Sequence, residues 1–211
     1  MCTRNALSVV KEKFSALDPF KMAELSGAVF SNNRLHLDYC NLPVIVDYPE
    51  GTVGMVDNHP PLNNDERVLL LQYLSTACGL PPRGQWLSFL DLRGGPLHWL
   101  PFQREALNPL ARYYHDRPEL FLEAGKKHGG ERVEMGDVAL VIPVLPRLPL
   151  TFMLWQGDDE FAPRGMILFD SVAESYLSTA ALYVLAIQAL IRIWFPGDTR
   201  FDGNSNGNNS R

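Results

Sequence analysis

Two apolar runs joined by a short turn dominate the pattern of hydrophobic and polar positions along the chain. They extend over 137–145 and 148–155, and Pro146-Arg147 separates them. Runs of this length, rich in branched residues and bounded by turn residues, predict two buried strands of one hairpin. After the polar loop 156–163, the apolar segment from Gly165 to Phe169 predicts a third strand.

A second hairpin is predicted near the beginning of the chain. The segment from Arg34 to Tyr39 alternates, with apolar residues at odd positions and polar residues such as His36 and Asp38 at even positions. Alternation with a period of two residues predicts a strand that buries one face and leaves the other in water. The segment from Pro43 to Tyr48 is expected to be its partner.

Helices are expected on both sides of each hairpin. N-cap residues mark where several of them begin, such as Asp18 before Pro19 and Ser178 before a run rich in Ala and Leu. The expected helical segments are 3–16, 18–27, 65–79, 103–127 with an interruption at Pro109, and 178–195.

The two hairpins have similar surroundings in the sequence. Shifting the sequence by one fixed number of residues places Gly27 on Gly130 and Leu42-Pro43 on Leu145-Pro146. The two repeats, about 18–80 and 116–195, are then each predicted to contain a helix, a hairpin and a second helix. Two explanations fit this likeness: an internal duplication, or a coincidence of two similar units. If the halves are duplicated, a cleft between them is the natural place for a binding site.

The patterns together predict an α+β fold in a single domain over 1–197. We expect an antiparallel sheet, built from the two hairpins plus one strand and flanked by helices. The segment 198–211 has little apolar content after Phe201 and is expected to be a disordered tail.

Composition narrows the classes of partner. With 46% hydrophobic and 20% charged residues, the chain can bury a sizeable core, and its net charge of -5 argues against nucleic acid as a partner. The apolar segment from Leu177 to Phe195 contains Gln188 and Arg192, which favours a buried core helix over a membrane span. The 3 cysteines lie far apart, as expected of free thiols in a reducing cytoplasm.

A cluster of aromatic and polar residues gives the candidate ligand-binding positions. We expect Trp86, Ser88, Arg93, His98 and Trp155 to line a cleft beside the polar loop, where tryptophan rings stack on a planar ligand. The alternative is structural: the tryptophans belong to the core, and the Ser88 hydroxyl forms a hydrogen bond to the backbone.

The loop after the second apolar run holds the candidate metal ligands. Asp158, Asp159 and Glu160 are adjacent, and neighbouring carboxylates repel one another unless water, a proton or a cation intervenes. A magnesium or calcium site is one interpretation, and a solvated loop with an acid paired to an arginine is the other. Phe161 is expected to hold this loop against the core.

Several motifs in a fixed order resemble those of a known family. They are Trp86-Leu-Ser-Phe, Gly94-Gly95, Gly129-Gly130, Gly136-Asp137, Leu154-Trp155, Asp159-Glu160-Phe161 and Leu168-Phe169-Asp170. On these motifs the chain resembles the domain of unknown function 3786 family, over about Ala23 to Trp194. The resemblance implies a setting in anaerobic microbes and carries over no reaction. Some relatives are joined to iron–sulfur segments, but this chain lacks a cysteine cluster, so none is inferred.

Three classes of function follow from these observations. The first is a cytoplasmic accessory or small-ligand-binding protein of anaerobic metabolism, with a small molecule or a protein as its partner. The second is a metal-dependent enzyme that uses Asp158, Asp159 and Glu160. The third is a protein-interaction adaptor that exposes its aromatic residues as a flat apolar patch. The sequence names no cofactor.

Overall fold

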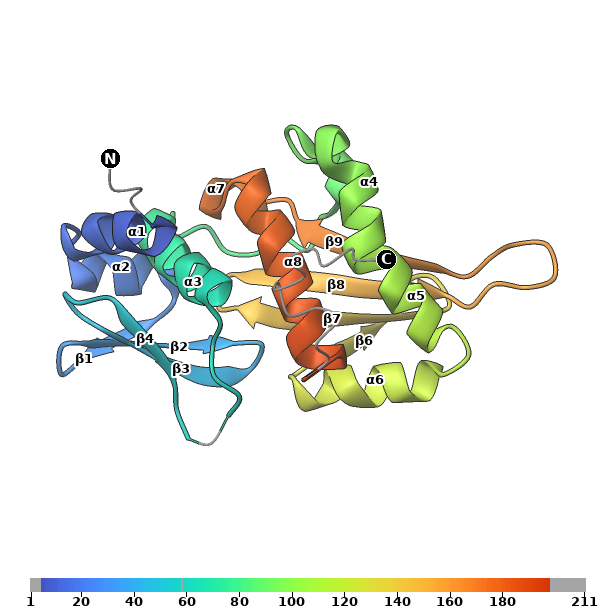
Figure 1. The fold of residues 1–211 in the computed structure, drawn as a ribbon, viewed down its shortest axis with the longest axis horizontal. Helices are drawn as coiled ribbons and strands as arrows, with labels where there is room; N and C mark the ends of the chain where they lie inside the picture. Colours follow the sequence, from blue (N-terminus) through green and yellow to red (C-terminus); the bar gives the residue numbers. More distant parts are fainter. Residues whose placement is uncertain (1–4, 58, 198–211) are drawn as a thin grey trace, which may run out of the picture.

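The structure is a computed structural model that describes residues 5–57 and 59–197 (Figure 1). It confirms an α+β fold with antiparallel sheets. The segment 198–211, which we expect to be a disordered tail, lies outside the described residues.

The first half of the chain forms a four-stranded sheet in the order β1-β2-β3-β4. Its strands are β1 (Val29–Ser31), β2 (Arg34–Tyr39), β3 (Leu42–Asp47) and β4 (Thr52–Met55). Two tight turns connect the first three strands, and all four turn residues have positive φ: Asn32, Asn33, Cys40 and Asn41. Turns of this kind match the twist of a hairpin, and asparagine tolerates the conformation well.

The second half forms a five-stranded sheet in the order β5-β9-β8-β7-β6. Its strands are β5 (Trp86–Ser88), β6 (Glu131–Val133), β7 (Val138–Leu145), β8 (Leu148–Trp155) and β9 (Arg164–Asp170). The predicted hairpin is β7 and β8, and the predicted third strand is β9. Both are confirmed.

Two helices begin at the capping residues that the sequence indicates, Asp18 and Ser178, whereas the helix expected from residue 65 begins earlier, after Asn63. Asp18 caps one helix, Ser178 caps another, and Asn63 forms a capping box with Glu66. The helices are α1 (Ala6–Ser15), α2 (Pro19–Ser26), α3 (Asn64–Thr76), α4 (Trp99–Phe102), α5 (Asn108–Tyr114), α6 (Pro118–Lys127), α7 (Ala173–Tyr176) and α8 (Thr179–Trp194). Short 3-10 turns cover Phe89–Asp91 and Gly95–His98, and a π-helical turn at Gln103–Leu107 joins α4 to α5.

The prediction that both hairpins share one sheet is wrong in this detail, because they lie in separate sheets. The edge of β7 that could receive β2 is occupied by β6 over Ala139 to Val141. The two hairpins still meet beyond that point, where the Cys40 amide donates to the Val144 carbonyl oxygen at 2.9 Å. The sheets are therefore neighbours joined at a corner.

Helices cover one side of each sheet, which we call the helix side (Figure 1). Phe152 on β8 lies 4.6 Å from Trp194 on α8, measured between ring centroids, and Phe169 on β9 lies 6.3 Å from Phe102. On the first sheet, the alternate residues Leu35 and Leu37 are buried. One hydrophobic cluster includes buried residues from both halves, and the division of the chain into domains stays a prediction.

The apolar segment at the end of the described chain forms α8, a helix buried in the core as expected. Its buried residues include Leu182, Leu185, Ala189 and Leu190. Among the described residues, no helix is long and apolar enough to cross a membrane.

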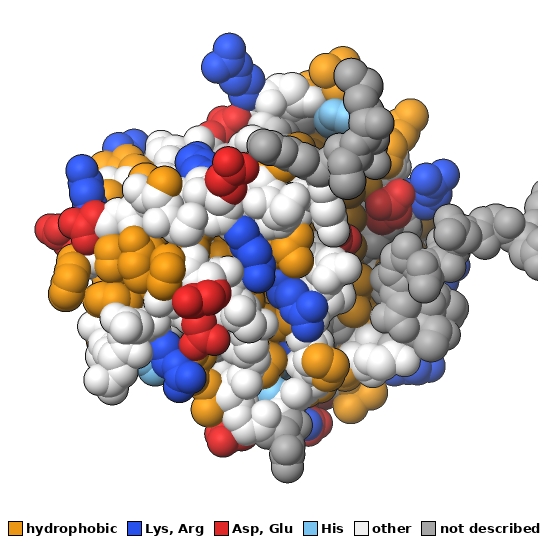
Figure 2. All heavy atoms as spheres, turned by 60° about the vertical axis from the view of Figure 1, so that its left-hand side comes forward, with side chains coloured by type: hydrophobic (Ala, Val, Ile, Leu, Met, Phe, Trp, Pro, Cys, Tyr) orange, Lys and Arg blue, Asp and Glu red, His pale blue; other side chains and the backbone are white. Residues whose placement is uncertain are grey.

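The surface of the first half carries charges of both signs. Figure 2 shows lysine, arginine, aspartate and glutamate side chains interspersed with polar and apolar ones over this face. Arg34 and Asp47 form one ion pair here, with Nε and Oδ1 2.9 Å apart.

Candidate functional site

A cavity of about 370 Å³ opens where the two sheets meet, on the side opposite the helices. We call it the crease. Its lining consists of polar His36, Asp38 and Asn41, of Gly27, and of an apolar set: Val29, Leu37, Pro43, Val44, Val56, Pro143 and Pro146. Because the lining comes from both halves, the cavity exists only when the halves are joined.

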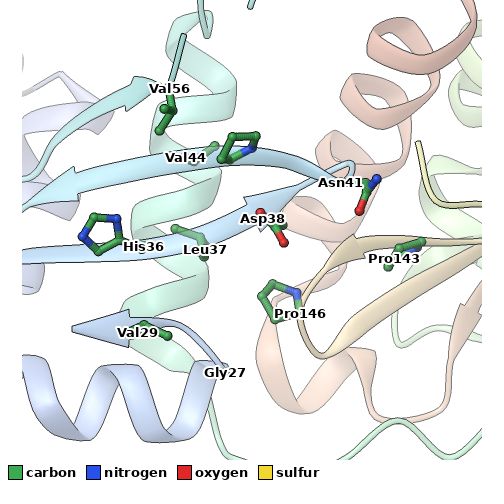
Figure 3. Close-up of a pocket in the computed structure, with 11 residues that line it drawn as sticks. Gly27, Val29, His36, Leu37, Asp38, Asn41, Val44, Val56, Pro143 and Pro146 are labelled. Carbon is green, nitrogen blue, oxygen red and sulfur yellow. The ribbon is translucent and has the colours of Figure 1, made fainter. Parts of the chain in front are cut away.

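One wall of the crease is the hairpin of β2 and β3 (Figure 3). His36 and Asp38 lie two residues apart on β2, so they share the solvent-facing side of the strand. Their cross-strand partners are Ile45 and Pro43. The alternation that buries Leu37 in the core thus directs these two polar side chains toward the cavity.

The opposite wall is the hairpin of β7 and β8, which presents Pro143 and Pro146 across the gap (Figure 3). Both prolines are exposed, whereas Ile142 and Leu145 beside them are buried. Proline rings are rigid and apolar and carry no amide proton, so this wall offers contact area without hydrogen-bond donors.

The tip of the β2–β3 hairpin is held by the second half. His128, at the end of α6, places Nδ1 2.7 Å from the carbonyl oxygen of Cys40. Because a carbonyl only accepts, Nδ1 carries the proton. Burial lowers the pKa of His128, and the Cys40 contact opposes this effect only in part. The neutral imidazole therefore anchors the turn at Cys40, the residue before Asn41.

The tip of the β7–β8 hairpin is held by the first half in the same manner. The Arg147 side chain donates to the carbonyl oxygens of Gly79 and Glu24, each at 3.2 Å, and its amide donates to the Tyr73 hydroxyl at 3.1 Å. Gly27 has φ of +81°, and a Cβ there would lie 3.2 Å from Cβ of Pro146. Only glycine combines that conformation with such close packing.

The chemistry of the crease is set by an unpaired carboxylate. In the part of the chain that the structure describes, the Asp38 carboxylate has neither an ion-pair partner nor a hydrogen-bond donor. Among residues 5–57 and 59–197 no lysine or arginine is in the lining, and the nearest arginine, Arg147, follows Pro146 and packs beside Gly27. The one carboxylate of the described lining, Asp38, lies beside apolar proline rings. Such a site attracts a cation that also has hydrocarbon surface.

Two of the five predicted ligand-binding residues share one surface, which is not the crease. Trp86 on β5 and Trp155 on β8 lie on the side of the five-stranded sheet opposite its helices, with Met153 and Met166 in the same cluster. Trp155 also contacts Arg164, whose guanidinium carbon lies 5.9 Å from the ring centroid. The prediction that these tryptophans bind a ligand stays a prediction.

The other three predicted residues have local roles or face water. The Ser88 hydroxyl donates to Asp91 at 2.7 Å, and this contact lowers the pKa of the Asp91 carboxyl. The Arg93 amide donates to Glu174 at 2.8 Å, while the Arg93 side chain is exposed. His98 is exposed at the end of a 3-10 turn. None of the five lines the crease.

The acidic loop uses one of its carboxylates to fold itself. Asp158 accepts from the amides of Glu160 and Phe161, at 2.9 and 2.7 Å. Phe161 is 68% exposed, so the expectation that it holds the loop to the core is wrong. Over residues 5–57 and 59–197, no group of three or more His, Cys, Asp or Glu is placed to hold a metal ion. Metal binding by Asp158, Asp159 and Glu160 stays untested.

Sequence reasoning expects a cleft between the halves only if they are duplicated, and it names none of the residues that line the crease as ligand-binding. His36 and Asp38 were recognised as the polar face of a strand, which is also the pattern of any solvated strand. Their role depends on Pro143 and Pro146, which lie about a hundred residues away in the chain. No signal within one strand reports such a neighbour.

Comparison with known proteins gives one match. A family model described as Domain of unknown function (DUF3786) matches residues 18–191. No curated protein and no solved structure matches the chain.

Proposed function

This chain belongs to the family described as Domain of unknown function (DUF3786), and we propose that it is an accessory protein that binds a small organic cation in the crease. The observation that carries the proposal is the unpaired Asp38 carboxylate, which faces a proline wall in a cavity whose described lining has no lysine or arginine. A cytoplasmic, anaerobic setting is part of the proposal and comes from the family resemblance.

The residues of the crease divide the recognition between them. Asp38 binds an ammonium or guanidinium group through charge-assisted hydrogen bonds, while His36 and Asn41 accept or donate further bonds. Pro143 and Pro146 contact the hydrocarbon part of the ligand. A volume of about 370 Å³ suits a small molecule and not a folded partner.

Titration calorimetry with agmatine tests this function, because agmatine carries a guanidinium and an ammonium group on a short hydrocarbon chain. We expect saturable binding by the wild type and a loss of about tenfold or more in Asp38→Asn, since hydrogen bonds to charged groups contribute about 1.5–3 kcal/mol. A dicarboxylate of similar length serves as the ligand control and should not bind.

The matched protein control is Asp47→Asn. Asp47 lies on β3 of the same sheet but pairs with Arg34 and does not line the crease. It should leave agmatine binding unchanged. Equal binding by wild type and Asp38→Asn, or no binding by the wild type, would contradict the proposal.

A second candidate function, the interaction adaptor, is favoured by one specific observation. The side of the five-stranded sheet that bears Trp86 and Trp155 has an apolar cluster separate from the main core. Large apolar faces without a covering layer commonly mark docking sites.

A further inference from the structure

A second cavity, of about 320 Å³, opens where the five-stranded sheet meets the loop that joins β8 to β9. We call it the loop pocket. The loop extends beyond the end of the sheet (Figure 1). The two cavities lie at opposite ends of β7 and β8, because Pro146 in the turn between these strands lines the crease, whereas Asp137 and Trp155 at their other ends line the loop pocket. Its described lining is Asp137, Trp155, Gly157, Asp158, Phe161, Ala162 and Arg164.

Trp155 stands between two residues of opposite charge in the loop pocket. Arg164 is its cross-strand partner on β9, and the guanidinium carbon lies 5.9 Å from the centroid of the indole ring. Asp137 lies on the other side, because the next residue, Val138, pairs with Leu154 on β8. Neighbouring strands are about 4.8 Å apart, so the acid and the arginine belong to strands roughly 10 Å apart, with the indole between them.

Both charged groups beside Trp155 have hydrogen-bonding capacity left for a ligand. Oδ2 of Asp137 accepts from the Gln156 amide at 2.8 Å, and no described donor contacts Oδ1. Within residues 5–57 and 59–197, the Arg164 guanidinium contacts the indole but forms neither an ion pair nor a hydrogen bond. The loop pocket therefore offers a carboxylate acceptor on one side of an aromatic ring and guanidinium donors on the other.

The loop also holds a second aromatic residue in the lining. Phe161 is 68% exposed, yet its backbone is fixed at both ends: its amide donates to Oδ1 of Asp158 at 2.7 Å, and its carbonyl oxygen accepts from the Asp158 amide at 2.9 Å. Gly157 has φ of +79°, and a Cβ there would lie 2.7 Å from that carbonyl oxygen, so the turn is closed tightly. An exposed aromatic ring on an ordered turn, in one cavity with an indole, is suited to stacking on a planar ligand.

The order of acceptor, aromatic ring and donor selects the class of planar ligand. A ring stacked on Trp155 needs an N–H group directed at Asp137 and an acceptor directed at Arg164. A purine with a ring carbonyl, such as guanine, has both, because its ring N–H donates while the carbonyl oxygen and the adjacent ring nitrogen accept a bidentate arginine. Adenine presents the reverse order, with a ring acceptor in place of the N–H and an amino donor in place of the carbonyl.

We propose that the loop pocket binds an oxopurine, the uncharged purine with a ring carbonyl that guanosine and inosine share. This ligand differs from the organic cation of the crease in charge and in shape. Asp137 accepts from the ring N–H, Arg164 donates to the carbonyl edge, and Trp155 and Phe161 contact the faces of the ring. A volume of about 320 Å³ is within the usual range of small-molecule sites.

Titration calorimetry with guanosine, inosine and adenosine tests the proposal. We expect the wild type to bind guanosine and inosine saturably and adenosine about tenfold more weakly or not at all, because adenosine leaves Asp137 and Arg164 without matching groups. Phe161→Ala should weaken guanosine binding about fivefold or more, since it removes a stacking surface. Arg164→Gln should reduce the preference for guanosine over adenosine, because a glutamine amide can either donate or accept.

The matched control is Phe20→Ala. Phe20 is 70% exposed, as Phe161 is, but it lies on α2 and outside the loop pocket. This substitution should leave guanosine binding unchanged. Circular dichroism of each variant shows that it is folded.

Nuclear magnetic resonance locates the bound oxopurine. The indole N–H resonance of Trp155 should shift saturably with guanosine, while the amide of Asp38 in the crease should not. No saturable binding of guanosine, equal binding of guanosine and adenosine, or binding without a shift of the Trp155 resonance would overturn the proposal. Agmatine binding is measured with a different ligand and different variants, so the failure of one proposal is distinguishable from the failure of the other.

Discussion

At the scale of single residues, the contact between the halves depends on side chains that keep one protonation state. His128 is the clearest case, because its Nδ1 proton is donated to the Cys40 carbonyl while burial disfavours the charged ring. Arg192 and His59 are nearby cations or potential cations that lower the pKa of His128 further. Protonation of His128 thus opposes folding.

The pH dependence of stability follows from this. The pKa of His128 is lowered in the folded state from an ordinary value of 6.5, so the unfolded chain binds more protons in the window below 6.5. The free energy of unfolding should therefore fall as the pH decreases from about 6.5 toward the folded-state pKa of His128. Urea unfolding at a series of pH values measures the slope.

The control for His128 is the variant His128→Gln, whose amide can still donate to Cys40 but does not titrate. Subtracting its pH profile from that of the wild type isolates the contribution of His128 from those of the other histidines. A difference profile that is flat below pH 6.5 would count against the assignment.

At the scale of elements, the two hairpins hold each other's halves. The tip of β2 and β3 lies on Gly129 at the end of α6, and the tip of β7 and β8 lies on Gly27 at the end of α2. Both glycines have positive φ and end the helix before a sheet. Each repeat segment also has the same order, a helix, four strands and a helix: α2, β1 to β4 and α3 in the first, and α6, β6 to β9 and α8 in the second. Both features are expected of a duplication, and the duplication itself stays a prediction.

The sequence anticipates the long elements and misses the short ones. The strands β7 and β8 have eight residues each and enough apolar character to be identified alone. By contrast, β6 is Glu131–Val133, three residues of which two are charged, and β4 includes Gly54. Such segments are strands only because a neighbouring strand supplies hydrogen-bond partners, and local sequence does not encode that neighbour.

A buried ion pair joins α3 to α8. Nε and Nη2 of Arg192 lie 2.7 and 2.9 Å from the two carboxylate oxygens of Glu66, and the side chains are only 8% and 3% exposed. Arg192→Met alone leaves the Glu66 carboxylate buried without its partner, so we expect a loss of about 3–5 kcal/mol in unfolding free energy. Urea denaturation measures it.

A double-mutant cycle separates the pair from the packing around it. The double variant Arg192→Met with Glu66→Gln should lose less unfolding free energy than Arg192→Met alone, because the double variant buries no unpaired charge. The exposed pair Arg34–Asp47 is the reference, and Arg34→Met should cost at most about 1 kcal/mol. Equal losses in the single and double variants would show that the ion pair itself contributes little.

At the scale of the whole molecule, the union of two sheets creates a cavity that neither half has alone. The predicted ligand cleft, beside Trp86, Trp155 and the polar loop, is a different place from the crease, because these tryptophans lie on the side of the five-stranded sheet opposite its helices. The reason is geometric: the hairpins meet at one corner, so the aromatic residues of the second sheet remain on a surface of their own.

The most direct test of the account is a nuclear magnetic resonance titration of the full chain with agmatine. Amide resonances of His36, Asp38, Asn41 and Arg147 should shift saturably, because these residues line the crease or adjoin its wall, and in Asp38→Asn the same shifts should need about tenfold more agmatine or be lost. Absence of any saturable shift, or saturable shifts confined to the loop 156–163 or to the surface around Trp86 and Trp155, would contradict a ligand site in the crease.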